Sequence, residues 1–378
     1  MSDVTIFAPS PTLTVTVEDH PDGDEIHIHT GGQGVWQARM LLRFDVSVTL
    51  CCVLTGETGT VARHLLEDEG ITVAAVTRDG RGSAYLHDRR GGERVEIAEE
   101  EGDPLGRHEL DEVYSLMIRE GLASKLVILS GPTGDDALPA DTYRRLAADL
   151  REAGATVIVD LAGERLAAAV DGGVDVLKLS DEELEEDGLA DSDDDGPVIA
   201  AMRALRERGA RTVIVTRAHD PLLLLDEEGV LEITPPSLEV ADTRGAGDSL
   251  VAGVVAGLVR GESVREAITL GAAAGALNVT RHGLGTGDPD AIAQLRKTVS
   301  TRELAGGGAS GAEHTPEDAD GEPSGRVSPD GLATLAEPDG PDERDASAER
   351  PHPDEPDEPD EPGEPDHADE PDRPEHAP

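Results

Sequence analysis

The chain is poor in aromatic residues and in cysteine. The first shortage limits which side chains can fill the core, and the second bears on the compartment that the protein suits. Aromatic residues make up 2% of the 378 positions, so aliphatic side chains must fill the core. The only cysteines, Cys51 and Cys52, are adjacent in an apolar stretch, and adjacent cysteines rarely form a disulfide. We therefore expect two reduced, packed thiols and a cytoplasmic protein.

Long apolar runs are also missing. None is long enough to span a bilayer. The N-terminal stretch "MSDVTIFAPSPTLTVTV" lacks the basic region and following apolar region of a secretory signal. We expect no association with a membrane.

Basic residues are few, and lysine occurs only three times. The net charge is −48, with 25 acidic and 5 basic residues from position 301 onward and 55 against 27 before it. A folded body this acidic repels nucleic acid and anionic membranes, so neither is expected as a partner. A salty cytoplasm would screen the self-repulsion; a compositional bias of the genome is the alternative explanation.

The last part of the chain contains almost no aliphatic residues. Residues 303–378 are dominated by proline, glycine and acids, as in "DEPDEPDEPGEPDHADEP". Such a segment cannot bury enough apolar surface to offset its ordering entropy. The sequence predicts one folded domain over residues 1–302 and a disordered acidic tail after it.

Within that domain, short apolar runs alternate with helical stretches. Strands are expected at "VSVTLCCVL", "KLVILSG", "TVIVDLAG", "VDVLKLS" and "RTVIVTR", and a typical intervening helix is "LPADTYRRLAADLREAG". This alternation favours an α/β fold, a doubly wound and mainly parallel sheet flanked by helices.

Two segments, near residues 12–30 and 82–98, do not follow this alternation of strands and helices. Both alternate polar and apolar residues and turn at Asp-Gly or Gly-Gly, as hairpins with one wet face do. We expect a small β-sheet that acts as a lid over a cleft. Exposed hairpin edges would also be consistent with pairing between two subunits in a homodimer.

The stretch "ADTRGAGDSLVAG", which begins at Ala241, predicts a tight turn and then a helix starting near Ala246 or Gly247. The first N–H groups of a helix attract anions, and small residues let the backbone approach them. Gly245, Ala246 and Gly247 are thus suited to hold phosphoryl oxygens, and Asp248 could accept a proton from an attacking hydroxyl. Ordinary helix capping is the competing interpretation of this motif taken alone.

The surrounding sequence resembles the ribokinase-like, PfkB-type sugar kinases over approximately residues 3–300. "DTRGAGDSLVAG" resembles the family's C-terminal signature, and "GGQGVWQARML" resembles its N-terminal one. The stretches "LSGPTGDDALPADTYRRL", "VDLAGERLAAAV" and "LKLSDEEL" resemble further family motifs in the same order. The pattern is most similar to the phosphofructokinase and tagatose-6-phosphate kinase branch. The resemblance implies a ribokinase-like fold with a β-sheet lid, and ATP-dependent phosphoryl transfer to a sugar or sugar phosphate.

The resemblance also implies roles for individual residues. Asp248 would be the catalytic base, the backbone of Gly245, Ala246 and Gly247 the anion hole, and Glu183 would help to organise Mg²⁺ through water. Gly31 and Gly32 would let the sugar approach the backbone, and Arg81 would face a substrate phosphate. The nucleotide side would contain Thr216, Arg217, Asn278 and Gly283.

The departures from the branch cluster on the substrate side. Gln33 stands in place of a lysine, Trp36 in place of an asparagine, and Thr14 in place of an aspartate that reads sugar hydroxyls. A neutral amide does not replace a point charge on a phosphate, whereas a tryptophan could stack on a sugar or a base. In addition, Ser180 replaces the asparagine of the metal-organising motif, and Pro221 stands where a glycine is usual.

Three functions therefore remain open at this point. A 1-phosphofructokinase-like hexose kinase is the first; a kinase for a different acceptor, such as a nucleoside, is the second. The third is a sugar- or nucleotide-binding regulator with little or no turnover. Two smaller features also have two interpretations: His27 and His29 as a metal pair or as lid residues, and Arg39 as a phosphate contact or as a surface ion pair.

Overall fold

The computed structural model of the chain describes residues 2–21, 23–92, 94–132, 138–191, 194–218, 220–280 and 285–304. The expected tail lies outside the described residues from position 305 on. Its expected first residues, 303 and 304, belong instead to a strand, β14 (Ser300–Leu304).

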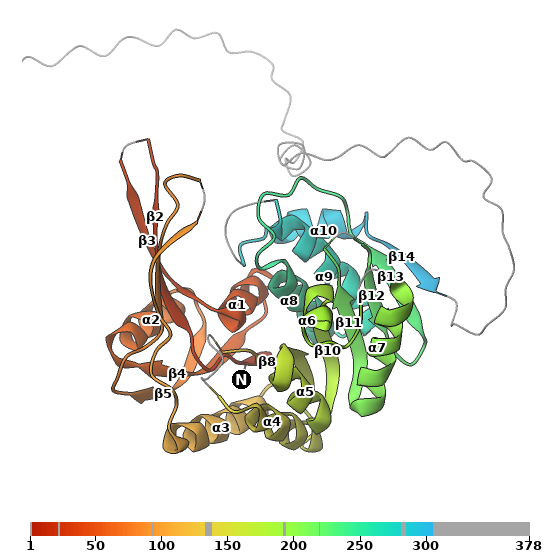
Figure 1. Ribbon diagram of the computed structural model, residues 1–378, viewed down its shortest axis with the longest axis horizontal. Helices are drawn as coiled ribbons and strands as arrows, with labels where there is room; N and C mark the ends of the chain where they lie inside the picture. The colour runs from red at the N-terminus through yellow and green to blue at the C-terminus, as the bar shows by residue number, and fades with distance from the viewer. Residues whose placement is uncertain are drawn as a thin grey trace, which may run out of the picture. The chain divides into compact units, whose positions relative to one another are not determined.

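A sheet of ten strands occupies the centre of the described domain (Figure 1). Seven neighbouring strands are parallel, in the sheet order β5 (Thr72–Arg78), β4 (Val48–Thr55), β1 (Val4–Phe7), β8 (Leu126–Ser130), β9 (Thr156–Asp160), β10 (Val174–Ser180) and β11 (Ala210–Thr216). Three antiparallel strands continue the sheet, β12 (Leu222–Leu225), β13 (Val230–Thr234) and β14. The expected doubly wound, mainly parallel sheet is confirmed.

Helices cover both faces of this sheet. On one face lie α1 (Gln33–Arg43), α2 (Gly56–Asp68), α8 (Ala246–Val259), α9 (Val264–Asn278) and α10 (Pro289–Arg296). On the other face lie α3 (Arg107–Gly121), α4 (Ala140–Glu152), α5 (Gly163–Gly172) and α7 (Asp195–Arg208), while the short α6 (Asp181–Glu186) follows β10. Because side chains alternate along a strand, Ile6 joins the first core and Phe7 the second. This explains why β4 is buried at every position.

The lid forms as a second sheet of four strands, in the order β3 (Glu25–Gly31), β2 (Thr12–Glu18), β6 (Ala84–Asp88) and β7 (Val95–Glu100). Both expected hairpins are present. A parallel pairing of β2 with β6, which the sequence did not predict, joins them into one sheet. In Figure 1 the β2 and β3 strands extend away from the main sheet.

The lid has an inverted amphipathic pattern. Its polar face is buried, with Thr14 and Thr16 on β2 and His87 on β6 at most 7% exposed. Its other face carries exposed apolar side chains, among them Ile26 and Ile28 on β3, which are 66% and 52% exposed. A buried polar face is expected where a sheet covers a binding cleft, and an exposed apolar face is expected where a partner covers it.

Helices α8 and α9 approach so closely that only glycine fits between them. A Cβ atom on Gly253 would lie 2.7 Å from the Cα atom of Gly271. We predict that Gly253→Ala lowers the free energy of unfolding by about 1–3 kcal/mol, because overpacking outweighs the better helix propensity of alanine. Urea or thermal unfolding measures the change.

Gly196→Ala is the matched control, because Gly196 also lies in a helix and has no atom within 4 Å of its Cβ position. It should leave stability unchanged or raise it by about 0.4–1 kcal/mol. Equal effects of the two substitutions would contradict the close α8–α9 contact.

Candidate active site

The carboxyl ends of three neighbouring strands bring polar side chains to one level. Ser130 ends β8 and Asp160 ends β9, and the two residues are in register. Lys178 on β10 is in register with Asp160 on its other side. Strand β1 lies between β4 and β8, so the strand order reverses nearby, and open α/β sheets bind ligands beyond their carboxyl ends at such points.

Helices α1 and α8 complete this cluster, and they pack against each other although they are far apart in the sequence (Figure 1). Gln37 on α1 is fully buried. Its Nε2 donates to Asp160 Oδ2 at 2.9 Å and to Asp248 Oδ1, in the first turn of α8, at 3.2 Å. The Ser130 hydroxyl donates to Gln37 Oε1 at 2.6 Å. One carboxamide therefore joins both helices to the sheet.

The Lys178 ammonium is the cation of the cluster. Its Nζ donates to Asp160 Oδ1 at 3.1 Å, and the side chains of the pair are 9% and 1% exposed. A Cβ atom on Gly247 would lie 2.9 Å from this Nζ. A positive charge thus lies directly against the first turn of α8, and position 247 has no room for a side chain.

Helix α8 begins at Ala246, within the range expected from the sequence. Gly245 precedes it with φ = 73°, a left-handed conformation that favours glycine. No side chain caps this helix. The Ala246 N–H donates to the Thr243 carbonyl at 3.4 Å, and the following N–H groups of the first turn, with their positive partial charge, can attract an oxyanion.

The electrostatics of the cluster centre on Asp248. Burial, reinforced by the charge of Asp160, raises the pKa of Asp248 to about 8, although Lys178 and the Gln37 amide pull it down. Burial alone would lower the pKa of Lys178, but Asp160, Glu183 and Asp248 outweigh burial and hold that pKa above its usual value. A carboxylate that titrates near neutral pH beside a helix N-terminus can accept a proton where an anion is bound.

The expected acceptor-side residues lie together at the base of the lid. A Cβ atom on Gly31 would lie 2.9 Å from Thr14 Oγ1 and 3.9 Å from Trp36 Cζ2. The Trp36 Nε1 atom is buried and has no hydrogen-bond partner among the described residues. Gly32 precedes α1 with φ = 110°, and Gln33 Oε1 accepts a bond from the Gly131 N–H at 2.8 Å.

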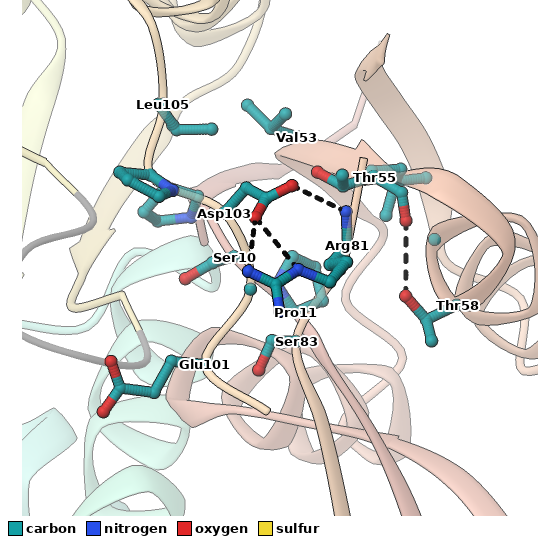
Figure 2. Close-up of a pocket in the computed structure, with 16 residues that line it drawn as sticks. Ser10, Pro11, Val53, Thr55, Thr58, Arg81, Ser83, Glu101, Asp103 and Leu105 are labelled. Carbon is teal, nitrogen blue, oxygen red and sulfur yellow. Dashed lines mark hydrogen bonds and ion pairs between the residues drawn. The ribbon is translucent and has the colours of Figure 1, made fainter. Parts of the chain in front are cut away.

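Arg81 lies elsewhere, in a pocket of about 160 Å³ between the base of the lid and the end of β4 (Figure 2). Its guanidinium pairs with Asp103 at 3.2 Å and with Glu100 at 3.3 Å, and Figure 2 shows the Asp103 carboxylate turned toward it. The cluster around Asp248 does not line this pocket. That Arg81 faces a substrate phosphate stays a prediction.

The expected nucleotide-side residues are held by protein contacts. Arg217 donates to the Pro221 carbonyl at 2.7 Å and pairs with Asp195 at 2.6 Å. Thr216 ends β11 beside Leu179, whose carbonyl its hydroxyl reaches at 3.5 Å.

Asn278 is buried, accepts a bond from Ser249 at 3.1 Å and donates to the Arg244 carbonyl at 2.7 Å, so it braces the start of α8. Gly283 lies outside the described residues. Roles for these residues in nucleotide binding stay predictions.

Glu183 belongs to the start of α6. Its Oε2 accepts a bond from the Ser180 N–H at 2.6 Å, while the Ser180 hydroxyl accepts one from the Glu183 N–H, which forms a capping box. No group of three or more histidine, cysteine or acidic side chains in the described part of the chain could hold a metal ion. His27 pairs with Glu25 at 3.3 Å, and Arg39 forms a two-bond ion pair with Glu69.

Sequence reasoning missed four members of the cluster, Gln37, Ser130, Asp160 and Lys178. Two of them left a signal, because Asp160 and Lys178 are charged residues in otherwise apolar, buried strands. Buried charges are rare unless they are paired. Gln37 and Ser130 gave no comparable signal, since their partners come from distant parts of the chain.

The fold is ribokinase-like, with a β-sheet lid, and a helix N-terminus and an acidic side chain lie at the carboxyl edge of the main sheet. The family described as pfkB family carbohydrate kinase matches residues 3–291. The chain therefore belongs to the PfkB family and is a carbohydrate kinase, an enzyme class that uses ATP.

Two curated relatives and two solved structures are similar to the chain. The chain is 29% identical to 1-phosphofructokinase from Bacillus subtilis, over 73% of this chain and 89% of the relative. It is 27% identical to ATP-dependent 6-phosphofructokinase isozyme 2 from Escherichia coli, over 73% and 92%.

The structure of phosphofructokinase-2 from Escherichia coli in complex with fructose-6-phosphate is similar, with a TM-score of 0.68 and 23% identity over 79% of this chain and 99% of that one. The ribokinase of Arabidopsis thaliana complexed with ribose and ATP follows with a TM-score of 0.61 and 19% identity over 79% and 99%. These two structures support the fold.

The raised pKa of Asp248 has a consequence for stability. The folded protein holds this proton up to about pH 8, whereas the unfolded chain loses it near its usual value of 3.8. Stability is therefore lost as the pH rises between these values. We predict that Asp248→Asn, which cannot ionise, is more stable than the parent at pH 8 by on the order of 5 kcal/mol, at about 1.4 kcal/mol per unit of pKa difference.

Urea unfolding at pH 5 and at pH 8 tests this, and the gain should be larger at pH 8. Asp149→Asn, at a site on α4 that bonds Tyr114, is a control for the loss of one negative charge. A gain that does not depend on pH would show that Asp248 is not held protonated by the fold.

Proposed function

We propose that this carbohydrate kinase transfers the γ-phosphoryl group of ATP to a hydroxyl of a hexose phosphate, in the manner of a 1-phosphofructokinase. The observation that carries the proposal is the position of Asp248, in the first turn of α8 and hydrogen-bonded to the buried Gln37 amide. The curated relatives support the acceptor class, because several of them are named 1-phosphofructokinase.

In this proposal Asp248 is the catalytic base. It accepts the proton of the attacking hydroxyl as the bond to phosphorus forms, and its pKa of about 8 matches a base that works near neutral pH. The backbone of Gly245, Ala246 and Gly247 would face the charge that develops on the transferred group, with the Ala246 N–H released from the Thr243 carbonyl for this contact. Lys178 adds a fixed positive charge beside Gly247.

The buried face of the lid supports a phosphorylated acceptor. Burial, together with the charges of Arg94, Arg89 and Arg244, lowers the pKa of His87 to about 4. His87 is thus neutral at physiological pH, and its Nδ1 has no partner among the described residues. Arg89 pairs with Glu18 and Arg244 with Asp242, so the arginine charge of this face is partly compensated; the remainder would favour a phosphate. Thr14, Gly31 and Trp36 lie at the base of this face and would contact the sugar.

A neutral acceptor, such as a free sugar or a nucleoside, is the second candidate. Gln33 stands where a lysine is expected, and its carbonyl oxygen is bound to the Gly131 N–H. Arg81 is bound by two carboxylates. Neither residue offers an uncompensated charge to a phosphate, whereas the Trp36 ring could stack on a planar or apolar face.

Mg²⁺ is the metal that we propose to accompany ATP. The described residues lack a protein cage for it, but Mg²⁺ keeps several waters and commonly takes one or two carboxylates together with substrate phosphates. Glu183, whose charge acts on both Lys178 and Asp248, would take part in this mode of binding through water. When bound, the ion would neutralise phosphate charge.

We further propose a homodimer and a cytoplasmic location. A second copy of the chain would cover the exposed apolar lid face around Ile26 and Ile28, which is unfavourable in water. No helix among the described residues is long and apolar enough to cross a membrane. Both cysteines are free and buried, and burial raises their pKa values, which agrees with a reducing compartment.

ATP consumption by the purified protein tests the acceptor, with Mg²⁺ and at low and high salt. The panel contains fructose 1-phosphate, fructose 6-phosphate, tagatose 6-phosphate, fructose, ribose and common nucleosides. We expect turnover on a hexose phosphate and a loss of about 10²–10⁴ in kcat for Asp248→Asn, with nucleotide binding retained. Turnover on neutral acceptors alone would favour the second candidate. Equal, very low rates for both proteins would indicate a binding protein without catalysis.

The dimer has its own test, measured by light scattering after size-exclusion chromatography. Ile28→Lys places a charge on the apolar lid face and should convert a dimer into a monomer. Val61→Lys changes an exposed valine on α2, outside the lid, and should leave the dimer intact. A parent protein that elutes as a monomer would refute the proposed dimer.

A further inference from the structure

A buried glutamine lies between the proposed base and the strand ends. Gln37 is 0% exposed on α1, and every polar atom of its side chain has a partner: Oε1 accepts from Ser130, and Nε2 donates to Asp160 and Asp248. A buried amide with all its bonds made is rigid and strongly specifies its surroundings.

The direction of the amide is fixed by its partners. Asp160 accepts from the Lys178 ammonium on one oxygen, so the NH₂ group faces its other oxygen, and the same group donates to Asp248 Oδ1. The Ser130 hydroxyl at 2.6 Å holds the carbonyl end and prevents the amide from turning over. The two N–H bonds of one NH₂ group thus hold two carboxylates that would otherwise repel each other.

The far carboxylate is itself anchored. Asp160 ends β9, is 1% exposed, and takes the Lys178 ammonium on its other oxygen at 3.1 Å. Gln37 therefore ties Asp248, on a helix from the C-terminal part of the domain, to a fixed pair on the sheet. Asp248 is the third residue of α8, and the Gln37 amide holds its carboxyl group from the neighbouring helix.

We infer that Gln37 is a positioning residue for Asp248: its amide holds the carboxyl group in a fixed direction at the start of α8 and, as a hydrogen-bond donor, favours its proton-accepting form. The inference rests on the proposed function, in which Asp248 is the base. Gln37 does not touch the reacting atoms and is not a catalytic residue.

The other charged groups that act on Asp248 are Asp160 on β9, Lys178 on β10 and Glu183 on α6. Asp160 and Glu183 favour its protonated form, while Lys178 and the Gln37 amide favour its ionised form. Removing the Gln37 donor must therefore raise the pKa of Asp248 and move the acidic limb of the rate profile to higher pH.

The test is Gln37→Met, which keeps the length and volume of the side chain and removes both donors. The measurement is kcat/KM from pH 5.5 to pH 9.5 with ATP and the best acceptor, because this ratio reports the free enzyme. We expect the acidic limb to shift upward by about one pH unit, with roughly tenfold lower activity at pH 7 and recovery toward the parent rate at high pH.

Gln294→Met, at an exposed glutamine on α10, is the matched control and should leave the profile unchanged. A purely structural role for Gln37 predicts a lower melting temperature and lower activity at every pH, with the limb in its original place; that result would overturn the inference. If Gln37→Met does not fold, Ser130→Ala frees the amide carbonyl instead and should shift the limb in the same direction by a smaller amount. An unmoved limb in Ser130→Ala would also count against the inference.

Asp248→Asn, measured beside these variants, distinguishes the role of Gln37 from the role of Asp248 as the base. An inactive Asp248→Asn with an unmoved limb in Gln37→Met refutes the role of Gln37 and leaves the proposed function intact. An active Asp248→Asn refutes Asp248 as the base, and the role of Gln37 is then refuted with it.

Discussion

The buried pair of Asp160 and Lys178 is the interaction on which the candidate site depends. The two side chains are 1% and 9% exposed and join the ends of adjacent strands. Charges buried this deeply are tolerated only when they are paired and hydrogen-bonded, and Asp160 meets that condition with Lys178 on one oxygen and Gln37 on the other. The Gln37 amide connects Asp160 to Asp248, and the Lys178 ammonium lies against Gly247 at the start of α8.

The same arrangement gives the helix N-terminus its chemistry. Gly245 is left-handed and no side chain caps α8, so N–H groups of its first turn after Ala246 can attract an oxyanion. Burial, reinforced by the charges of Asp160 and Glu183, raises the pKa of Asp248 into the range that suits a base. Burying Asp248 lowers the stability of the fold and gives a carboxylate that titrates near neutral pH, a combination that is common at active sites.

The lid shows how substrate specificity can change while this centre is kept. Its buried face is polar and gathers histidine and arginine, whereas the family's usual lysine and asparagine are replaced by Gln33 and Trp36. The Gln33 oxygen is bonded to the backbone after β8, so this residue now holds the base of the cleft together.

The sequence by itself determined the fold class, the two hairpins of the lid and the start of α8, because these depend on local periodicity and on glycine. It also carried the family resemblance, which the comparisons confirm. Only the tertiary structure decided that β2 pairs with β6, that Arg217 is held by Asp195, and that Gln37 lies between two carboxylates. These contacts join residues that are up to 211 positions apart, and no local pattern encodes the meeting of such distant side chains.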